Sequence, residues 1–320
     1  MEKKIPLLVV AGPTATGKTK TAVELAREFD GEVVSADSMQ IYRYMDIGTA
    51  KPTEKEKKGI PHYMIDVVEP DEEYSVSDYQ NDTQKVIQQI YNRRKLPILA
   101  GGTGLYIKAV VDDYYFSEAT IDWNFRKKMK EIAKEYGNDF LYSKLREVDP
   151  FSAKRIHPND VKRIIRALEV YHQTGKPISY YEEKTRETKS PYNVLIIGLT
   201  MPREILYKKI DKRVDKMIER GLVEEVKMLL EMGYNENLNS MKGLGYKQII
   251  KHLKGEYSLE EAVRLIKRDT RRFAKRQFTW FRRDNRIKWI NPLKNDPVKI
   301  AKEKIKSLLQ EIQHFTRISI

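Results

Sequence analysis

Residues 5–19, IPLLVVAGPTATGKT, decide the fold of this chain. The apolar run of residues 5–11 precedes GPTATGKT, which fits the phosphate-binding pattern G-x-x-x-x-G-K-[ST] from Gly12 to Thr19. In such a pattern a buried strand leads into a glycine-rich turn, and the backbone N–H groups of the turn and of the following helix converge on an anion. The segment therefore predicts a strand, an anion-binding loop and a helix that begins at Lys18.

The side chains of this loop are expected to divide their roles. Lys18 supplies a point charge, and the Thr19 hydroxyl can ligate Mg²⁺ beside a phosphate. The predicted phosphate-binding residues are Gly12, Pro13, Thr14, Ala15, Thr16, Gly17, Lys18 and Thr19. The alternative is an ordinary strand, turn and helix with accidental glycines.

Composition excludes several classes of protein. The chain has 320 residues, 40% of them hydrophobic, and contains no cysteine, which rules out disulfides, thiol catalysis and cysteine-ligated zinc. Its five histidines show no metal-ligand spacing, so we expect any metal to be Mg²⁺ that accompanies phosphate. No apolar stretch approaches the roughly 18 residues of a membrane span, and the N-terminus lacks a signal-peptide core. We expect a cytoplasmic monomer without membrane contact.

Strand-like and helical segments alternate in the first third of the chain, which is typical of a parallel sheet with crossover helices. The predicted strands are 5–11, 32–36, 62–67 and 96–100, and the predicted helices are 18–29 and 75–94. The expected fold class is α/β, with a P-loop NTPase-like parallel sheet core.

The pattern becomes charged and helical after residue 111, and residues 112–190 predict a mostly helical insertion domain. The sheet then resumes and amphipathic helices follow. The expected segments are a strand at 192–200, helices from Pro202, a strand at 286–291 and a terminal helix from Asp296. The core should therefore comprise residues 1–111 and 191–320.

Positive charge is concentrated outside the phosphate loop. The net charge is +14, and residues 1–111 carry 15 basic and 16 acidic side chains, a balance of −1 that leaves +15 for residues 112–320. Residues 264–288 alone hold 11 Lys and Arg against two Asp. This surplus indicates a polyanionic partner. The alternative is a solvated helix face whose aromatic residues belong to the core.

A phosphate loop alone does not distinguish a kinase, an ATPase and another transferase, so the accompanying carboxylates matter. An NTPase normally places an Asp at the end of a buried strand to organise Mg²⁺. The strand at 96–100 ends in glycines instead, and Asp66 is the alternative for that role. Asp37 ends the strand 32–36 and should face the same crevice as the loop, where it could take a proton from an amine or hydroxyl. Its structural alternative is an Asx-turn.

Six blocks of sequence, taken in order, resemble the signatures of bacterial tRNA dimethylallyltransferases, the IPP transferase family. They are GPTATGKT from Gly12, SADSMQIYRYMDIGTAKP from Ser35, AGGTGLYIKA from Ala100, RIHPNDVKRIIRALEVY from Arg155, GLGYKQ from Gly243 and TRRFAKRQFTWFRR from Thr270. The blocks cover nearly the whole chain and are far more specific than a phosphate loop.

The resemblance implies a reaction and its partners. A dimethylallyl group would pass from dimethylallyl diphosphate to N6 of the adenine 3′ of the anticodon in tRNA, giving N6-isopentenyladenosine and diphosphate. The loop, with Mg²⁺, would then hold diphosphate as a leaving group. Asp37, Thr19 and Arg213 match the family's catalytic positions, with Asp37 as general base and Arg213 as a further diphosphate ligand. An ion pair of Arg213 with Asp211 or Asp215 is the structural alternative.

The resemblance also implies contacts with the tRNA anticodon stem-loop, in part through the helical insertion. The matching positions are Asp37, Ser38, Met39, Gln40, Thr103, Arg126, Lys162, Arg163, Ile164, Ile165, Arg166, Lys242, Gly243, Leu244, Gly245, Tyr246 and Lys247. Some relatives carry Arg at the position of Lys242. A lysine there would make a contact through a point charge instead of a forked contact. Solvated helix faces and turn residues are the structural alternatives for Arg126, residues 162–166 and Thr103.

Three other functions stay open at this point. An adenylate isopentenyltransferase would use the same donor on free nucleotides and would need no tRNA surface. A P-loop small-molecule kinase would consume an NTP. A non-catalytic RNA-binding module would use the basic helices alone.

Overall fold

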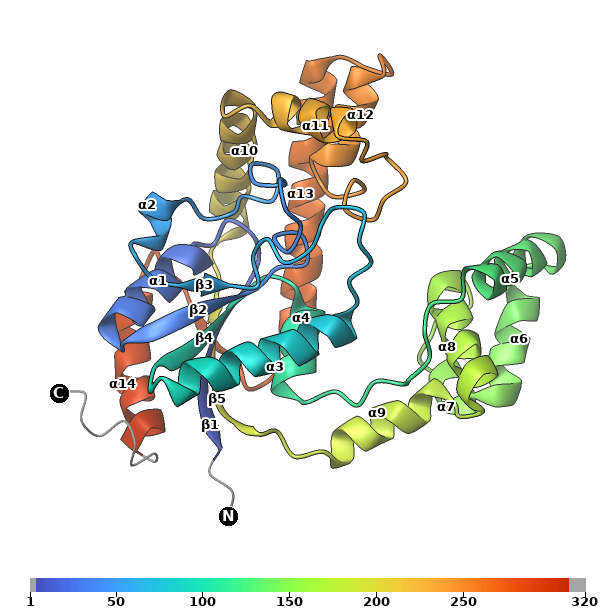
Figure 1. Ribbon diagram of the computed structural model, residues 1–320, viewed down its shortest axis with the longest axis horizontal. Coiled ribbons are helices and arrows are strands. Elements are labelled where there is room, and N and C mark those ends of the chain that lie inside the picture. Colours follow the sequence, from blue (N-terminus) through green and yellow to red (C-terminus); the bar gives the residue numbers. More distant parts are fainter. Residues whose placement is uncertain (1–3, 311–320) are drawn as a thin grey trace. The chain divides into compact units, whose positions relative to one another are not determined.

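The computed structural model describes residues 4–310, with side chains up to residue 305 (Figure 1). The chain forms two compact units. One, the sheet unit, comprises the residues up to Val111 together with those from Pro191 onward, and the other, the helical unit, comprises Asp112–Ser190. Within the described residues, no helix is both long and apolar enough to cross a membrane.

The sheet unit is built on six parallel strands in the order β3-β2-β4-β1-β5-β6. Their bounds are β1 Ile5–Ala11, β2 Gly31–Ala36, β3 His62–Tyr63, β4 Leu96–Gly101, β5 Tyr192–Leu199 and β6 Lys288–Ile290. The central strand β1 pairs with β4 and β5. In the sequence, β4 precedes the helical unit and β5 follows it, so both halves of the sheet unit meet at β1. The predicted α/β class with a parallel sheet is confirmed.

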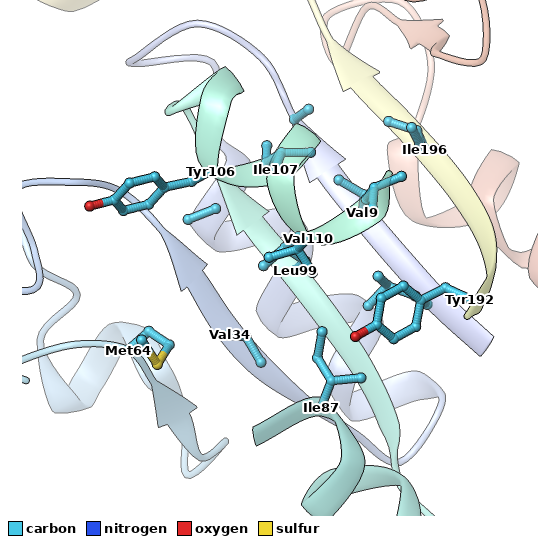
Figure 2. Close-up of a cluster of buried hydrophobic side chains, with 14 of the residues drawn as sticks. Val9, Val34, Met64, Ile87, Leu99, Tyr106, Ile107, Val110, Tyr192 and Ile196 are labelled. Atoms are coloured by element: carbon cyan, nitrogen blue, oxygen red, sulfur yellow. The ribbon is translucent and has the colours of Figure 1, made fainter. Parts of the chain in front are cut away.

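Helices cover both faces of the sheet because alternate side chains of the strands point to opposite sides. One core contains Leu7 and Val9 of β1 and is covered by α3 (Val76–Asn92) and α4 (Gly104–Val111). Figure 2 shows this core, with Ile107 and Val110 of α4 packed near Val9 and Leu99. The opposite core is covered by α1 (Lys18–Glu28) and α14 (Pro297–Gln310).

Two predicted strands are shorter in the structure than in the sequence pattern. The expected strand 62–67 is wrong beyond Tyr63, since Met64 and Asp66 adopt φ values of 61° and 55° and leave the strand conformation. The expected strand 286–291 is reduced to the three residues of β6. A short helix, α2 (Glu54–Lys57), was not expected; Thr53 and Glu56 form its capping box. The expected terminal helix is α14, and the remainder of that predicted tail lies outside the described residues.

Four further helices of the sheet unit lie beyond one end of the strands (Figure 1). They are α10 (Arg203–Glu219), α11 (Leu222–Glu231), α12 (Tyr246–Leu253) and α13 (Leu259–Phe281). Together with the long loop after β2 they enclose their own core, which includes Ile41, Met45, Val226, Ile249 and Ile266. This arrangement places α10 and α13 against the carboxyl ends of the strands, where ligands of open α/β sheets bind.

The helical unit contains α5 (Trp123–Tyr136), α6 (Asn138–Val148), α7 (Pro150–Ala153), α8 (Val161–Thr174) and α9 (Ile178–Glu187). Its core is formed mainly by α6 and α8, through Leu141, Leu145, Ile164, Ile165 and Leu168. Asp149 joins α6, α7 and α9 because its carboxylate accepts hydrogen bonds from the backbone of Ser152 and Ser179, at 2.9 and 3.0 Å. The unit therefore has an apolar core and internal polar anchors of its own.

Candidate active site

The phosphate loop follows β1 as the sequence predicts. Gly12 has φ 139°, and a Cβ there would lie 2.6 Å from the carbonyl oxygen of Leu199 in β5, so only glycine fits. Inside the loop, the Thr16 hydroxyl and the Lys18 ammonium both donate to the carbonyl of Pro13, each at 2.8 Å. Gly17 is the N-cap residue of α1 and provides no side chain to cap this helix. Its first N–H groups are therefore available to an anion.

A cavity of about 620 Å³ opens in front of the loop, and we call it the phosphate cavity. Five loop residues line it: Thr14, Ala15, Gly17, Lys18 and Thr19. The other three loop residues, Gly12, Pro13 and Thr16, are buried, and the hydrogen bond from Thr16 to the Pro13 carbonyl holds the loop conformation. Five cations also line the cavity, four of them on α10 and the last at its C-cap: Lys209, Lys212, Arg213, Lys216 and Arg220. Arg213, Lys216 and Arg220 follow one another at intervals of three and four residues, so they share one face.

The charges in the phosphate cavity repel one another in the absence of an anion. Desolvation, and secondarily the Arg213 guanidinium, lower the pKa of Lys18 to about 7, while Asp37 acts in the opposite direction. Desolvation likewise lowers the pKa of Arg213, against the attraction of Asp37 and Glu56. A bound anion would relieve both the desolvation and the repulsion. In the described chain Arg213 forms no ion pair with Asp211 or Asp215, which instead bind Arg271 and Lys267.

A second cavity of about 340 Å³ adjoins the first, and we call it the acceptor cavity. Most of the residues that the resemblance assigned to the nucleic acid line it, namely Asp37, Ser38, Met39, Thr103 and Gly243 to Lys247. Five residues line both cavities: Thr14, Asp37, Arg213, Met217 and Phe273. The two cavities therefore meet where Asp37 and Arg213 face each other.

Asp37 directly follows β2 at the carboxyl end of the sheet. Its Oδ1 atom accepts a hydrogen bond from the Met39 N–H at 2.9 Å, so the Asx-turn is present. The next residue, Ser38, donates its N–H to the Thr103 hydroxyl at 3.0 Å, and Thr103 donates its own N–H to the carbonyl of Ala36 at the same distance. The turn and the loop after β4 thus fix the direction of the carboxylate, and a structural role and a role in proton transfer are compatible.

Gln277 of α13 is a buried residue that sequence reasoning missed. Its Oε1 accepts the N–H of Thr14 in the phosphate loop, and its Nε2 donates to the carbonyl of Gly102 after β4, both at 2.9 Å. The side chain is only 7% exposed. One amide therefore holds the phosphate loop, the β4 loop and the basic helix α13 in register.

Glu225 of α11 is a second residue that sequence reasoning missed. One carboxylate oxygen accepts the N–H groups of Asp46 and Ile47 at 2.9 and 2.7 Å, and the other accepts the Gly48 N–H at 3.0 Å and the Tyr246 hydroxyl at 2.6 Å. A Cβ on Gly48 would lie 2.5 Å from the Tyr246 ring, so this approach requires glycine. Ile47 lines the phosphate cavity, whereas Gly48 and Tyr246 line the acceptor cavity.

The remaining predicted residues of the sheet unit have more local roles. Gln40 lines the phosphate cavity and bridges the Ser35 hydroxyl to the carbonyls of Thr49 and Ala50. Lys242 is exposed and donates to the carbonyl of Asn237 at 2.5 Å. Asp66, the alternative Mg²⁺ ligand, is ion-paired with the buried Lys51 and lines neither cavity.

Two of the predicted contact residues of the helical unit, Arg126 and Arg166, bind the buried carboxylate of Glu169. Arg126 binds Glu169 through Nε and Nη2 at 2.7 and 2.8 Å, and Arg166 binds it at 2.7 Å. Burial alone would raise the pKa of Glu169, but the hydrogen bonds from Arg126, Asp122 and Arg166 lower it below its usual value. Both arginines therefore stabilise the unit as well as carrying positive charge.

The range 162–166 divides into exposed and buried residues. Lys162 and Arg163 are exposed, whereas Ile164 and Ile165 are 0% and 3% exposed and belong to the core of the helical unit. The prediction that the side chains of Ile164 and Ile165 contact tRNA is therefore wrong, since helical periodicity turns them inward. On the basic helix α13, Phe281 is likewise buried, whereas Arg276 lines the acceptor cavity.

A family model described as IPP transferase matches residues 40–284 of this chain. The chain belongs to the IPP transferase family. The family resemblance drawn from the six sequence blocks is thus confirmed. Family relatives cover nearly the whole chain: one from Acetivibrio thermocellus, named tRNA dimethylallyltransferase, is 56% identical over 285 residues, which are 89% of this chain and 91% of that protein. A relative of the same name from Alkaliphilus metalliredigens is 48% identical over the full length of both chains.

Solved structures of IPP transferases share the fold. The tRNA isopentenylpyrophosphate transferase of Bacillus halodurans is 42% identical, with a TM-score of 0.71, and the match covers 96% of this chain and 98% of that chain. A eukaryotic dimethylallyltransferase, described as acting on tRNA, is 31% identical, with a TM-score of 0.74 over 90% of this chain and 74% of that chain.

Proposed function

We propose that this protein transfers the dimethylallyl group of dimethylallyl diphosphate to N6 of the adenine 3′ of the anticodon in tRNA, releasing diphosphate. The observation that carries the proposal is the junction of the two cavities. A cationic cavity for an anion and a separate cavity for an acceptor share Asp37 and Arg213 on their common wall. A transfer reaction needs its leaving group and its nucleophile on opposite sides of the reacting carbon, and this geometry supplies both places.

Diphosphate is held as a leaving group in the phosphate cavity. The phosphate loop and the N-terminus of α1 offer N–H groups, while Lys18 and Arg213, which both line the cavity, supply charge. As the bond between C1 and the bridging oxygen breaks, its electron pair goes to the diphosphate. The negative charge that develops is stabilised by cations that are already in place. Desolvation and, secondarily, repulsion by Arg213 lower the pKa of Lys18, and a bound anion offsets both effects.

Asp37 serves the nucleophile from the other side of the reacting carbon. The lone pair of adenine N6 is delocalised into the ring, so the amine is a poor nucleophile unless it is oriented and deprotonated. An N6 lone pair forms the new bond to C1 while the Asp37 carboxylate accepts a proton from the same amine. The Asx-turn and the hydrogen bond between Ser38 and Thr103 hold this carboxylate towards the acceptor cavity.

The residues present fit an Mg²⁺ ion that arrives with diphosphate. Within the described residues, no group of three or more His, Cys, Asp or Glu side chains forms a ready metal site. Mg²⁺ typically uses one or two protein oxygens together with phosphate oxygens and water. Thr19, at the start of α1 and on the wall of the phosphate cavity, would hold it. When bound, the ion supplies further positive charge to the departing diphosphate.

The tRNA anticodon stem-loop is bound by both units. In the sheet unit, Lys247 and Arg276 line the acceptor cavity and can contact phosphates on either side of the target nucleotide. In the helical unit, Lys162 and Arg163 are exposed, and Arg126 adds charge from the Glu169 cluster. The adenine has to leave its stack to place N6 beside Asp37, as bases do when enzymes modify them.

Mass spectrometry of nucleosides tests the proposal. Unmodified tRNA is incubated with the protein, dimethylallyl diphosphate and Mg²⁺, alongside reactions with AMP as acceptor and with ATP as the only donor. We expect N6-isopentenyladenosine only when tRNA and the allylic donor are both present. Prenylated AMP would favour an adenylate isopentenyltransferase, and a phosphorylated product from ATP would favour a kinase.

A further inference from the structure

The junction between the phosphate cavity and the acceptor cavity contains two large apolar side chains. Of the five residues that line both cavities, Thr14, Asp37 and Arg213 are polar, and only Met217 and Phe273 are apolar. Both are half-buried. Apolar surface of this kind between two highly polar cavities requires an explanation, because it would otherwise be exposed to water on the side that faces the junction.

The helices fix both side chains relative to the reacting groups. Met217 lies four residues after Arg213 on α10, and Phe273 lies four residues before Gln277 on α13, so each shares a helix face with its neighbour. One helical turn corresponds to about 5.4 Å. The α10 and α13 helices also pack against each other. The apolar pair is thus held about one turn from a diphosphate ligand and from the side chain that positions the phosphate loop.

We propose that Met217 and Phe273 form the wall that binds the hydrocarbon chain of the donor and sets its length. This inference rests on the proposed prenyl transfer. C1 of the donor lies between the departing oxygen and the incoming amine, so its remaining carbons must extend from the junction itself. They gain by leaving water, and the apolar surface available there belongs to these two residues.

The residues around Met217 and Phe273 indicate which space a truncation of either side chain would open. The Arg276 guanidinium lies over the Phe273 ring, 5.7 Å from its centre, and thereby limits the ring's freedom to move aside. The acceptor cavity is also lined by Ile210 and Val214 of α10, which are apolar and buried. Removing either wall residue would widen the junction beside these apolar side chains and provide space for a donor longer by one isoprene unit.

A competition assay tests the assignment. Wild-type protein, Phe273→Ala and Met217→Ala each receive tRNA with equal concentrations of dimethylallyl and geranyl diphosphate, and mass spectrometry counts the two modified adenosines. Their ratio gives the ratio of kcat/KM for the donors directly. Phe273→Leu and Met217→Val are milder variants that keep the test decisive if an alanine variant does not fold. Met228→Ala, at an exposed position on α11, is the matched control.

We expect the preference for the shorter donor to fall by at least about tenfold in the wall variants, the scale on which apolar pockets discriminate between chain lengths. The preference in Met228→Ala should equal that of the wild type. An unchanged preference in folded variants that still modify tRNA would overturn the inference and leave the proposed function intact. Absence of any prenylated nucleoside with the wild type would instead refute the proposed function.

Discussion

Replacing Glu225 by Gln should loosen both cavities at once. The carboxylate accepts four hydrogen bonds, from the N–H groups of residues 46–48 and from the hydroxyl of Tyr246. An amide has one acceptor oxygen, which can keep one pair of these bonds. Its NH₂ group can donate to the Tyr246 oxygen, but it faces at least one N–H group that then has no acceptor. An unsatisfied buried donor costs about 1–3 kcal/mol, and the lost negative charge weakens the bonds that survive.

We therefore expect Glu225→Gln to lower the free energy of unfolding by about 2–4 kcal/mol, measured by urea titration. Because Ile47 lines one cavity and Gly48 the other, KM should rise for both the allylic donor and tRNA. The control is Glu224→Gln, the exposed neighbour on the same helix, which should change stability by less than about 0.5 kcal/mol. Equal unfolding curves and equal KM values for the two variants would refute this account of the loop.

Three further predictions concern the phosphate loop and the helical unit. An anion stabilises the charged form of Lys18 and so raises its pKa from about 7, which means that binding takes up a proton above that pH. The affinity for inorganic diphosphate, measured by calorimetry, should therefore fall as pH rises from about 7 to about 9. Lys18→Met should remove the part of this pH dependence that Lys18 causes. Gln277→Leu leaves the Thr14 N–H and the Gly102 carbonyl without their partner and should reduce kcat/KM for the donor by at least about tenfold, whereas unchanged kinetics would contradict the positioning role. Ile164→Ala should destabilise the helical unit by about 2–5 kcal/mol in urea unfolding, and a cost near zero would contradict its place in the core.

The parts of the fold that local patterns specify could be predicted from the sequence. The strand before Gly12 is a continuous apolar run because it is buried on both faces, and its motif fixes the turn and helix that follow. Asp37 could be placed at the end of a strand because it directly follows the strand-like run of β2. The segment after Tyr63 could not, because the backbone N–H groups of Asp66 and Val67 bind the carbonyls of Gln40 and Ile41 in the long loop after β2, a pairing that no alternating pattern announces.

The residues that were missed depend on contacts between distant parts of the chain. Glu225 and Gly48 are 177 positions apart, and Gln277 and Thr14 are 263 apart. A single sequence gives no signal for such pairs, since Glu and Gln on a charged helix usually face solvent. Ile164 and Ile165 are the opposite case, because the block from Arg155 matches the family at these positions as well as at their exposed neighbours, whereas helical periodicity marks the two isoleucines as core.

The role of Asp37 is tested most directly by a single-turnover measurement with Asp37→Asn. Protein in excess over tRNA, with saturating dimethylallyl diphosphate and Mg²⁺, is sampled over time for N6-isopentenyladenosine, and tRNA affinity is measured in parallel. The account predicts that the rate falls by about 10²–10⁴-fold while tRNA affinity changes only a few-fold, because the amide keeps the shape but does not accept the proton. A rate close to that of the wild type would contradict the assignment of Asp37 as the base.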